Sequence, residues 1–181
     1  MSPLEPAPFP RAPLERRAYA FLLDFTSVWI FSSLATGVVQ AFVFLALWWG
    51  LRVVVVQANQ GQSLGTWAFD LKVVELKLRR LPTVLTLTKR EGVLGIAAYL
   101  AMAGLNINFL NAVSTLLLVA PLAADCGLAL GDETFQQALH DRVAGTVIIR
   151  TKRGFSLDLR LKRLVYELRK QWRLRQDNRR R

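Results

Sequence analysis

From Ala18 to Val56 the chain carries only two charged side chains, Asp24 and Arg52. A soluble domain has no use for so long an apolar block, because its helices keep a polar face toward water. Two membrane spans of about 20 residues fit within the block, and Gly37 is a natural break between them. A charge in hydrocarbon costs roughly 2.5–3.5 kcal/mol on insertion scales, so both charges must face protein or water. The block therefore predicts a membrane protein.

A second apolar block, Gly92–Leu130, is interrupted by a cluster of asparagines, Asn106, Asn108 and Asn111. We therefore expect an all-α polytopic bundle of about four transmembrane helices, at residues 17–35, 38–56, 92–105 and 110–130. The third is short, so a two-span or three-span protein with an interfacial or re-entrant segment stays open. Segments 1–17, 57–91 and 131–181 hold 3, 6 and 14 of the 24 Lys and Arg residues. The positive-inside rule then places both termini in the cytoplasm.

Composition excludes several classes of function. The 181 residues include one cysteine, Cys126, and one histidine, His140, so neither an internal disulfide nor a histidine-rich or cysteine-rich metal site is expected. No phosphate-binding G-x-x-x-x-G-K-[ST] loop is present. We expect no enzyme, no catalytic residue, no cofactor and no metal.

The charges inside the apolar blocks form a predicted polar cluster of Asp24, Arg52 and Asp125. A hairpin turning at Gly37 places Asp24 beside Arg52, and Asp125 lies near the cytoplasmic end of the fourth helix. Such a cluster is either an ion or proton site or a structural clasp that fixes helix packing. Arg17 shares a helix face with Asp24 but lies ~10 Å away along the axis, so we expect it to reach the lipid headgroups.

Two cytoplasmic segments flank the predicted bundle. Residues 1–16 are rich in proline, and we expect a disordered leader. Residues 151–181 combine an apolar stripe with many basic side chains, which predicts a basic amphipathic helix. It would bind an anionic lipid surface or a partner protein, and nucleic acid is a third alternative that we do not expect. The candidate binding residues are Arg160, Lys162, Arg163, Arg169, Lys170, Trp172 and Arg173.

The segment that follows the second helix is also expected at the membrane surface. Trp67, Phe69, Leu71, Val73 and Leu76 fit an amphipathic interfacial segment, with basic neighbours toward the headgroups.

Three ordered motifs resemble the RDD family of bacterial membrane proteins. They are the Arg16–Asp24 stretch, the Gly61–Gly65 run G-Q-S-L-G, and the Leu139–Val147 run L-H-D-R-V-A-G-T-V. The resemblance covers an RDD-like domain at residues 17–150, with departures at Thr66 and Asp70. It implies functional roles for Arg17 (or Arg16), Asp24, Gly61, Gln62, Gly65, His140 and Asp141, with Asp125 as an alternative to Asp141.

The sequence leaves two functions open. The first is a non-enzymatic factor that assists or stabilises a larger membrane-protein complex, with the bilayer and a membrane-protein partner or a second copy as contacts. The second is a small secondary transporter exchanging cations for protons, a role that the resemblance implies for some family members. His140 beside Asp141 fits a proton relay, whereas Asp141 paired with Arg142 or Arg17 fits a structural pin. The expected location is the bacterial cytoplasmic membrane or an internal membrane such as the thylakoid.

Overall fold

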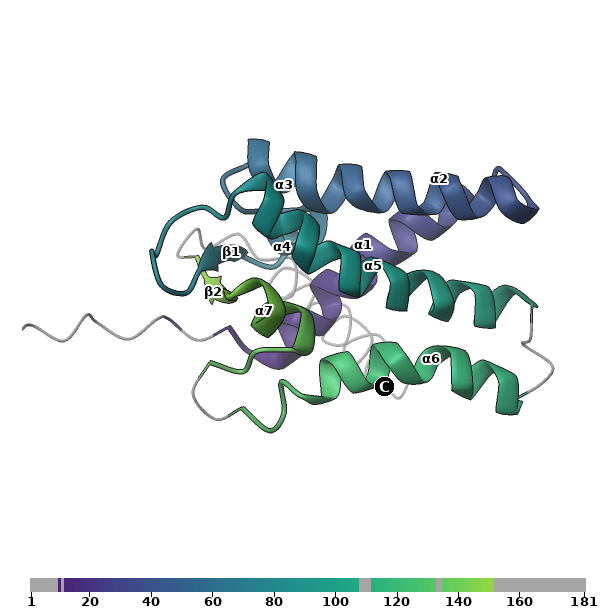
Figure 1. The fold of residues 1–181 in the computed structure, drawn as a ribbon. Coiled ribbons are helices and arrows are strands. Elements are labelled where there is room, and N and C mark those ends of the chain that lie inside the picture. Colours follow the sequence, from purple (N-terminus) through teal and green to yellow (C-terminus); the bar gives the residue numbers. More distant parts are fainter. Residues whose placement is uncertain (1–9, 11, 108–111, 133–134, 152–181) are drawn as a thin grey trace, which may run out of the picture.

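Four long helical segments, running alternately up and down, make up most of the residues that the structure describes (Figure 1). The computed structural model describes residue 10 and residues 12–107, 112–132 and 135–151. Most of the expected leader, two of the three asparagines in the second turn, and the whole candidate tail helix from residue 152 onward lie outside the described residues. The segments are α1 (Leu14–Ser32), the continuous run α2 (Gly37–Trp49), η1 (Gly50–Val54) and α3 (Val55–Ala58), then α5 (Val84–Ile107) and α6 (Ala112–Gly127).

The second segment has the properties of a transmembrane helix. Its 22 residues, Gly37–Ala58, span ~33 Å at 1.5 Å per residue, and its most apolar window has a mean hydropathy of 2.0. Among the described residues it is the one helix both long and apolar enough to cross a bilayer, while α6 is apolar but shorter. Both α1 and α5 carry charged residues near the end where the sheet lies.

The third segment begins earlier than the sequence indicated. It starts at Val84 rather than at residue 92, because Thr83 caps it: Thr83 Oγ1 accepts the Thr86 N–H at 3.2 Å. Arg90 and Glu91 therefore lie inside a helix of 24 residues. The expected range of 92–105 was wrong, and the shortness that left an interfacial segment open is not a property of this helix.

The first helix is also displaced from its expected range, and the fourth lies within its expected range but ends three residues before Leu130. α1 starts three residues earlier, directly after Pro13, whose fixed φ suits a helix start. It ends where Ser32 and Ser33 turn back to bond the Trp29 carbonyl. α6 covers Ala112–Gly127 and contains Pro121.

A two-stranded antiparallel sheet was not expected. β1 (Leu71–Glu75) pairs with β2 (Thr146–Arg150), with Val73 opposite Ile148. The expected interfacial segment is thus a short helix, α4 (Leu64–Ala68), followed by a strand, and the all-α expectation is incomplete. β-branched residues favour strands, but the partner strand lies far along the chain, so periodicity within one segment does not reveal the pairing.

Two apolar cores lie at different depths in the bundle. One joins α1, α2 and α5 and is rich in aromatic rings; its buried members are Phe25, Val28, Phe44, Trp48, Leu94, Ala98 and Met102. The other lies at the sheet end and includes Ala20, Val53, Leu71, Leu87 and Ile148. Buried charged side chains lie between these two cores on three elements: Asp24 on α1, Arg52 on η1, and Arg90 and Glu91 on α5. A layer of charge is therefore enclosed by apolar packing on both sides.

The outer surface of the long helices is apolar. Only 22% of the most apolar window in Gly37–Ala58 is buried, and large side chains such as Phe42 and Leu117 are about 70% exposed. A soluble helix that exposed so much apolar surface would be poorly solvated, whereas lipid accommodates it.

Candidate functional site

Arg52 is the centre of the enclosed charge layer. Its Nη1 donates to Asp24 Oδ2 at 2.7 Å, and its Nε and Nη2 donate to Glu91 at 2.9 and 3.3 Å. The guanidinium also lies over the Trp48 ring, 5.3 Å from its centroid. Arg52 is on η1, a π-helical turn of a kind often found at functional positions. The expected contact between Asp24 and Arg52 is present, and Glu91 is an additional partner.

The second motif supplies the remaining bonds to Asp24. Ser63 Oγ donates to Asp24 Oδ2 at 2.6 Å, and the Gly65 N–H donates to Asp24 Oδ1 at 2.7 Å. Ser63 also caps α4 by exchanging bonds with Thr66. A Cβ at position 65 would lie 2.0 Å from the Ala20 carbonyl oxygen. Gly65 therefore allows α4 to approach α1 closely enough for the backbone to bind Asp24.

Gly61 and Gln62 connect this motif to the sheet. Gly61 has a φ of +92°, and a Cβ there would lie 2.6 Å from the Val73 carbonyl oxygen. Gln62 is buried, and its Nε2 donates to the Leu71 carbonyl at 2.6 Å. Both residues thus hold β1 beneath the helices and do not contact the charges directly.

Asp141 joins three parts of the chain. Arg90 Nε on α5 donates to Asp141 Oδ1 at 2.9 Å, and Arg17 Nη2 on α1 donates to Asp141 Oδ2 at 2.6 Å. Asp141 itself lies on the short helix α7 (Leu139–Ala144), just before β2. Arg17 also bonds the Gln136 carbonyl, and its side chain is only 10% exposed. The expectation that Arg17 reaches the headgroups was wrong, because a buried carboxylate binds it.

Asp125 lies elsewhere than expected. It binds His140, whose N–H and Nδ1 lie 2.8 and 2.6 Å from its two carboxylate oxygens. His140 Nε2 lies 3.2 Å from Arg90 Nη2. Because a guanidinium only donates, this contact assigns the imidazole proton to Nδ1, facing Asp125. Asp125 therefore reaches Arg52 through His140, Arg90 and Glu91, not by direct contact.

Arg90 and Glu91 are the functional candidates that sequence reasoning missed. They bond each other and join the Asp24–Arg52 contact to the Asp141 group, which makes one continuous network. Both are buried. The available signal was their position between Leu87 and Leu94 at helical spacing, which puts the charged pair on an apolar face.

The network brings charges of both signs together within a buried space. Three arginines (17, 52 and 90) face four carboxylates (24, 91, 125 and 141). Burial alone would raise the pKa of Asp141, but the adjacent guanidinium groups of Arg90 and Arg17 hold that pKa well below its usual value. Within the described part of the chain, no group of three His, Cys, Asp or Glu side chains is placed to hold a metal ion.

The low pKa of Asp141 predicts an acid-dependent loss of stability. A carboxylate with a depressed pKa stabilises the fold above its unfolded pKa of ~3.9, and this contribution falls as the pH drops below that value. We expect thermal melting in detergent to shift down below about pH 4. The Asp141→Asn variant should have a lower melting temperature than the unmodified chain at pH 7, and its melting temperature should fall less on acidification. An equally steep fall would contradict the prediction that Asp141 causes the acid-dependent loss.

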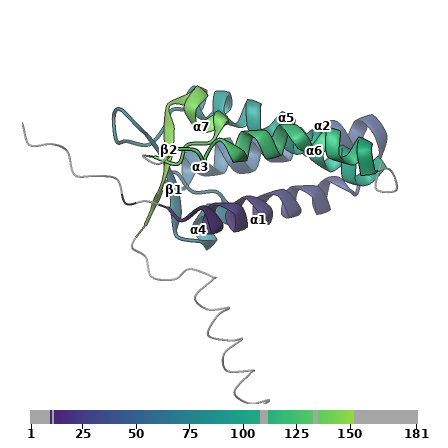
Figure 2. The ribbon, with the colours of Figure 1, turned by 90° about the horizontal axis from the view of Figure 1, so that it is seen from below.

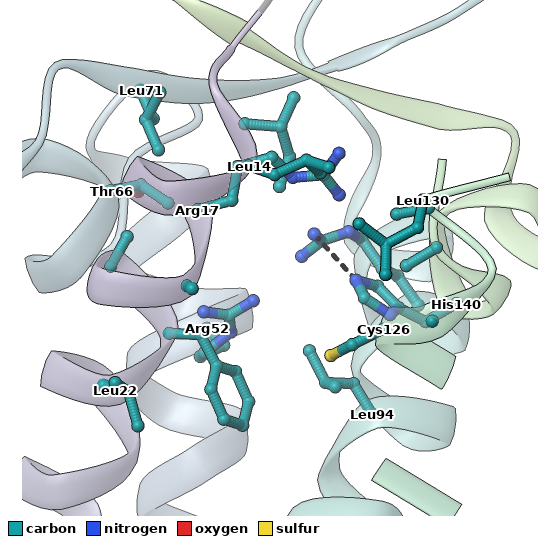
Figure 3. Close-up of a pocket in the computed structure, with 18 of the residues that line it drawn as sticks. Leu14, Arg17, Leu22, Arg52, Thr66, Leu71, Leu94, Cys126, Leu130 and His140 are labelled. Carbon is teal, nitrogen blue, oxygen red and sulfur yellow. Dashed lines mark hydrogen bonds between the residues drawn. The ribbon is translucent and has the colours of Figure 1, made fainter. Parts of the chain in front are cut away.

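A cavity of about 460 Å³ lies beside the network, between α1 and α6. Figure 3 shows Leu22 and Arg52 on one side of it and His140, Cys126 and Leu130 on the other. The walls are mostly apolar, but Arg17, Arg52, Arg90 and His140 also line them. None of the four carboxylates belongs to the lining.

A helical bundle with an apolar exterior and a buried layer of charge is a membrane protein. The chain belongs to the RDD family, whose model matches residues 11–145. That range includes the arginine and both aspartates for which the resemblance implies a role, together with the Gly61–Gly65 motif. No curated protein and no solved structure matches the chain. The functional roles of the motif residues stay predictions.

Proposed function

We propose that this chain is a four-span, non-enzymatic membrane protein that assists or stabilises a larger membrane-protein complex. Its location is the bacterial cytoplasmic membrane or an internal membrane such as the thylakoid, with both termini in the cytoplasm. The observation that carries the proposal is the charge layer, in which each arginine bonds a carboxylate on another element.

The arrangement of the helices supports four spans. The sheet, α4 and α7 lie at one end of the bundle, where α1 and α5 begin and where α3 and α6 end (Figures 1 and 2). The segment 59–83 joins the second and third segments at that end and holds four Lys and Arg residues, and Lys89 and Arg90 follow in the first turns of α5. The positive-inside rule favours this end as cytoplasmic.

The bonding of the aspartates supports a structural rather than a transporting network. The Asp24 carboxylate accepts bonds from Arg52, Ser63 and Gly65, and Asp141 accepts bonds from two arginines. Removing one partner of a buried ion pair typically costs 3–5 kcal/mol. A cation that used Asp24 would have to displace all three of its donors, so the network favours a fixed clasp.

A secondary transporter is the alternative, and one observation favours it. His140, whose imidazole can carry a proton on either ring nitrogen, lines the cavity and bonds Asp125. A proton could pass between these two groups and the cavity. Cation–proton exchange would also need a second conformation in which the arginines part from their carboxylates.

Truncation after Arg150 tests the assisting role. It removes 12 of the 24 basic residues and leaves the four long helical segments and both strands of the described residues. When native membranes are solubilised in gentle detergent, we expect the full chain to migrate with a large complex. The amount of truncated chain recovered in that complex should be at least about tenfold lower, because several surface charges worth ~1 kcal/mol each are lost.

A matched variant separates charge from length. Changing Arg160, Lys162, Arg163, Arg169, Lys170 and Arg173 to glutamine keeps the length of the tail and removes 6 of its 12 basic residues. We expect most of the complex to be lost from this variant, and high salt to weaken the full chain's complex through screening. Recovery of the full chain only as a homodimer, whatever the tail, would contradict the assisting role.

A further inference from the structure

The cavity separates two helices that pack against different neighbours. α1 packs on α2 and α4, whereas α6 packs on α5 and α7. Figure 2 shows α1 as a layer distinct from α5 and α6. Ala18, Phe21 and Leu22 of α1 face Ala123 and Cys126 of α6 across the cavity.

The cavity combines an apolar wall with a cationic end. Its volume of about 460 Å³ is within the ~300–1,000 Å³ of small-molecule sites. The hydrogen bonds of Arg52 and Arg90 to their protein partners use three of the five N–H groups in each guanidinium. The unused donors belong to side chains in the wall, while the carboxylates lie behind it.

The open side of the cavity is apolar and accessible. Leu22 is 52% exposed and Leu130 is 77% exposed, and both line the cavity. The lining extends from Leu14 at the start of α1 to Leu94, which belongs to the aromatic core. A ligand that entered between α1 and α6 would therefore meet arginines near the sheet end and apolar side chains deeper in the bundle.

We infer that this cavity binds an anionic bilayer phospholipid, with its headgroup at the arginines and one acyl chain along α1 and α6. A phosphate or a second acidic group accepts from the unused N–H groups, and the apolar wall covers the chain. The ammonium of a zwitterionic lipid would face guanidinium groups, so anionic headgroups should be preferred. This site goes beyond the proposed assisting role, and it holds whether or not the tail recruits a partner.

Cys126 allows a direct test on the full chain, because it is the single cysteine and lines the cavity. The delipidated protein is placed in nanodiscs of phosphatidylcholine, alone or mixed with phosphatidylglycerol, and labelled with neutral N-ethylmaleimide. We expect phosphatidylglycerol to slow labelling about tenfold, the protection expected at roughly ten times the dissociation constant. The matched control combines Leu117→Cys with Cys126→Ser, because Leu117 is 69% exposed on α6 outside the cavity. This control protein should be labelled equally in both bilayers.

Two variants and one soluble probe complete the test. Ala123→Trp fills the cavity and should abolish retention of phosphatidylglycerol in native mass spectrometry, whereas Val113→Trp, exposed outside it, should not. Arg17→Gln leaves Asp141 bonded to Arg90 and should reduce the preference for phosphatidylglycerol. Glycerol phosphate, which lacks acyl chains, should give no protection of Cys126.

Several outcomes would overturn the inference. Equal Cys126 labelling in the two bilayers would mean that the headgroup charge is not recognised. Protection by glycerol phosphate would indicate an anion site without a chain. Protection that rises with protein concentration rather than with phosphatidylglycerol would indicate that a second copy occupies the cavity.

Discussion

Replacing Arg52 by leucine should destabilise the bundle by about 3–5 kcal/mol, the largest loss expected for a single change in the network. The change leaves two carboxylates, Asp24 and Glu91, in a buried layer without their shared cation. Unfolding in mixed micelles, followed by tryptophan fluorescence, measures the loss. Arg80→Leu is the matched control, because its ion pair with Glu75 is 61% exposed on the arginine side and should be worth less than about 1 kcal/mol.

The rescue of Arg52→Leu tests whether the three charges act together. Adding Asp24→Asn should recover part of the loss, because it removes a buried carboxylate that has lost its cation. Adding Glu91→Gln as well should recover less, because Arg90 still pairs with Glu91. Coupling of about 0.5–3 kcal/mol between contacting residues is expected. Strictly additive losses along this series would show that the three side chains do not form one network.

Gly65→Ala should cost about 3 kcal/mol, the second-largest expected loss. The new Cβ would lie 2.0 Å from the Ala20 carbonyl oxygen, and a backbone atom cannot move aside as a side chain can. α4 must then separate from α1, so Asp24 loses the Gly65 N–H and the Ser63 hydroxyl. Overpacking costs typically 1–3 kcal/mol, and a lost hydrogen bond to a charged group ≈ 1.5–3 kcal/mol.

Gly92→Ala is the control for this prediction. Gly92 is exposed within α5, and nothing lies within 4 Å of the position its Cβ would occupy. Alanine should therefore stabilise the helix by up to about 1 kcal/mol. If Gly65→Ala left the unfolding free energy as unaffected as Gly92→Ala does, α4 would not need its close contact with α1.

The contact between Asp24 and Arg52 could be predicted from the sequence, because it depends only on where the chain turns between two consecutive helices. A hairpin that turns near Gly37 puts Asp24 opposite the turn of helix that carries Arg52, whatever the rest of the chain does. Arg90 and Glu91 were missed for a physical reason. The helix was expected to begin where hydrophobicity rises, at residue 92, whereas Thr83 caps it well before that point. Charges at the start of a span were thus assigned to the preceding loop.

The remaining contacts depend on chain segments that are far apart. The sheet joins residues 71–75 to 146–150, and neither strand can be recognised without the other. Asp125 was expected at the correct end of the bundle, but its partner is set by α7, whose orientation depends on Gly145 in the left-handed conformation and on β2. Arg17 was expected at the headgroups or, as one of two alternatives, on Asp141, and the structure has the contact with Asp141, 124 residues away in sequence.

If the buried charges are a structural clasp and not a path for ions, the chain should carry no cation-driven proton flux. The full chain is reconstituted in proteoliposomes, a sodium or potassium gradient is imposed, and internal pH is followed with a fluorescent dye. We expect no proton movement above protein-free vesicles for the unmodified chain, for Asp24→Asn, or for Glu75→Gln, which alters a charge outside the network. Cation-driven proton movement that is lost in folded Asp24→Asn but kept in Glu75→Gln would contradict this expectation and would identify the chain as a transporter.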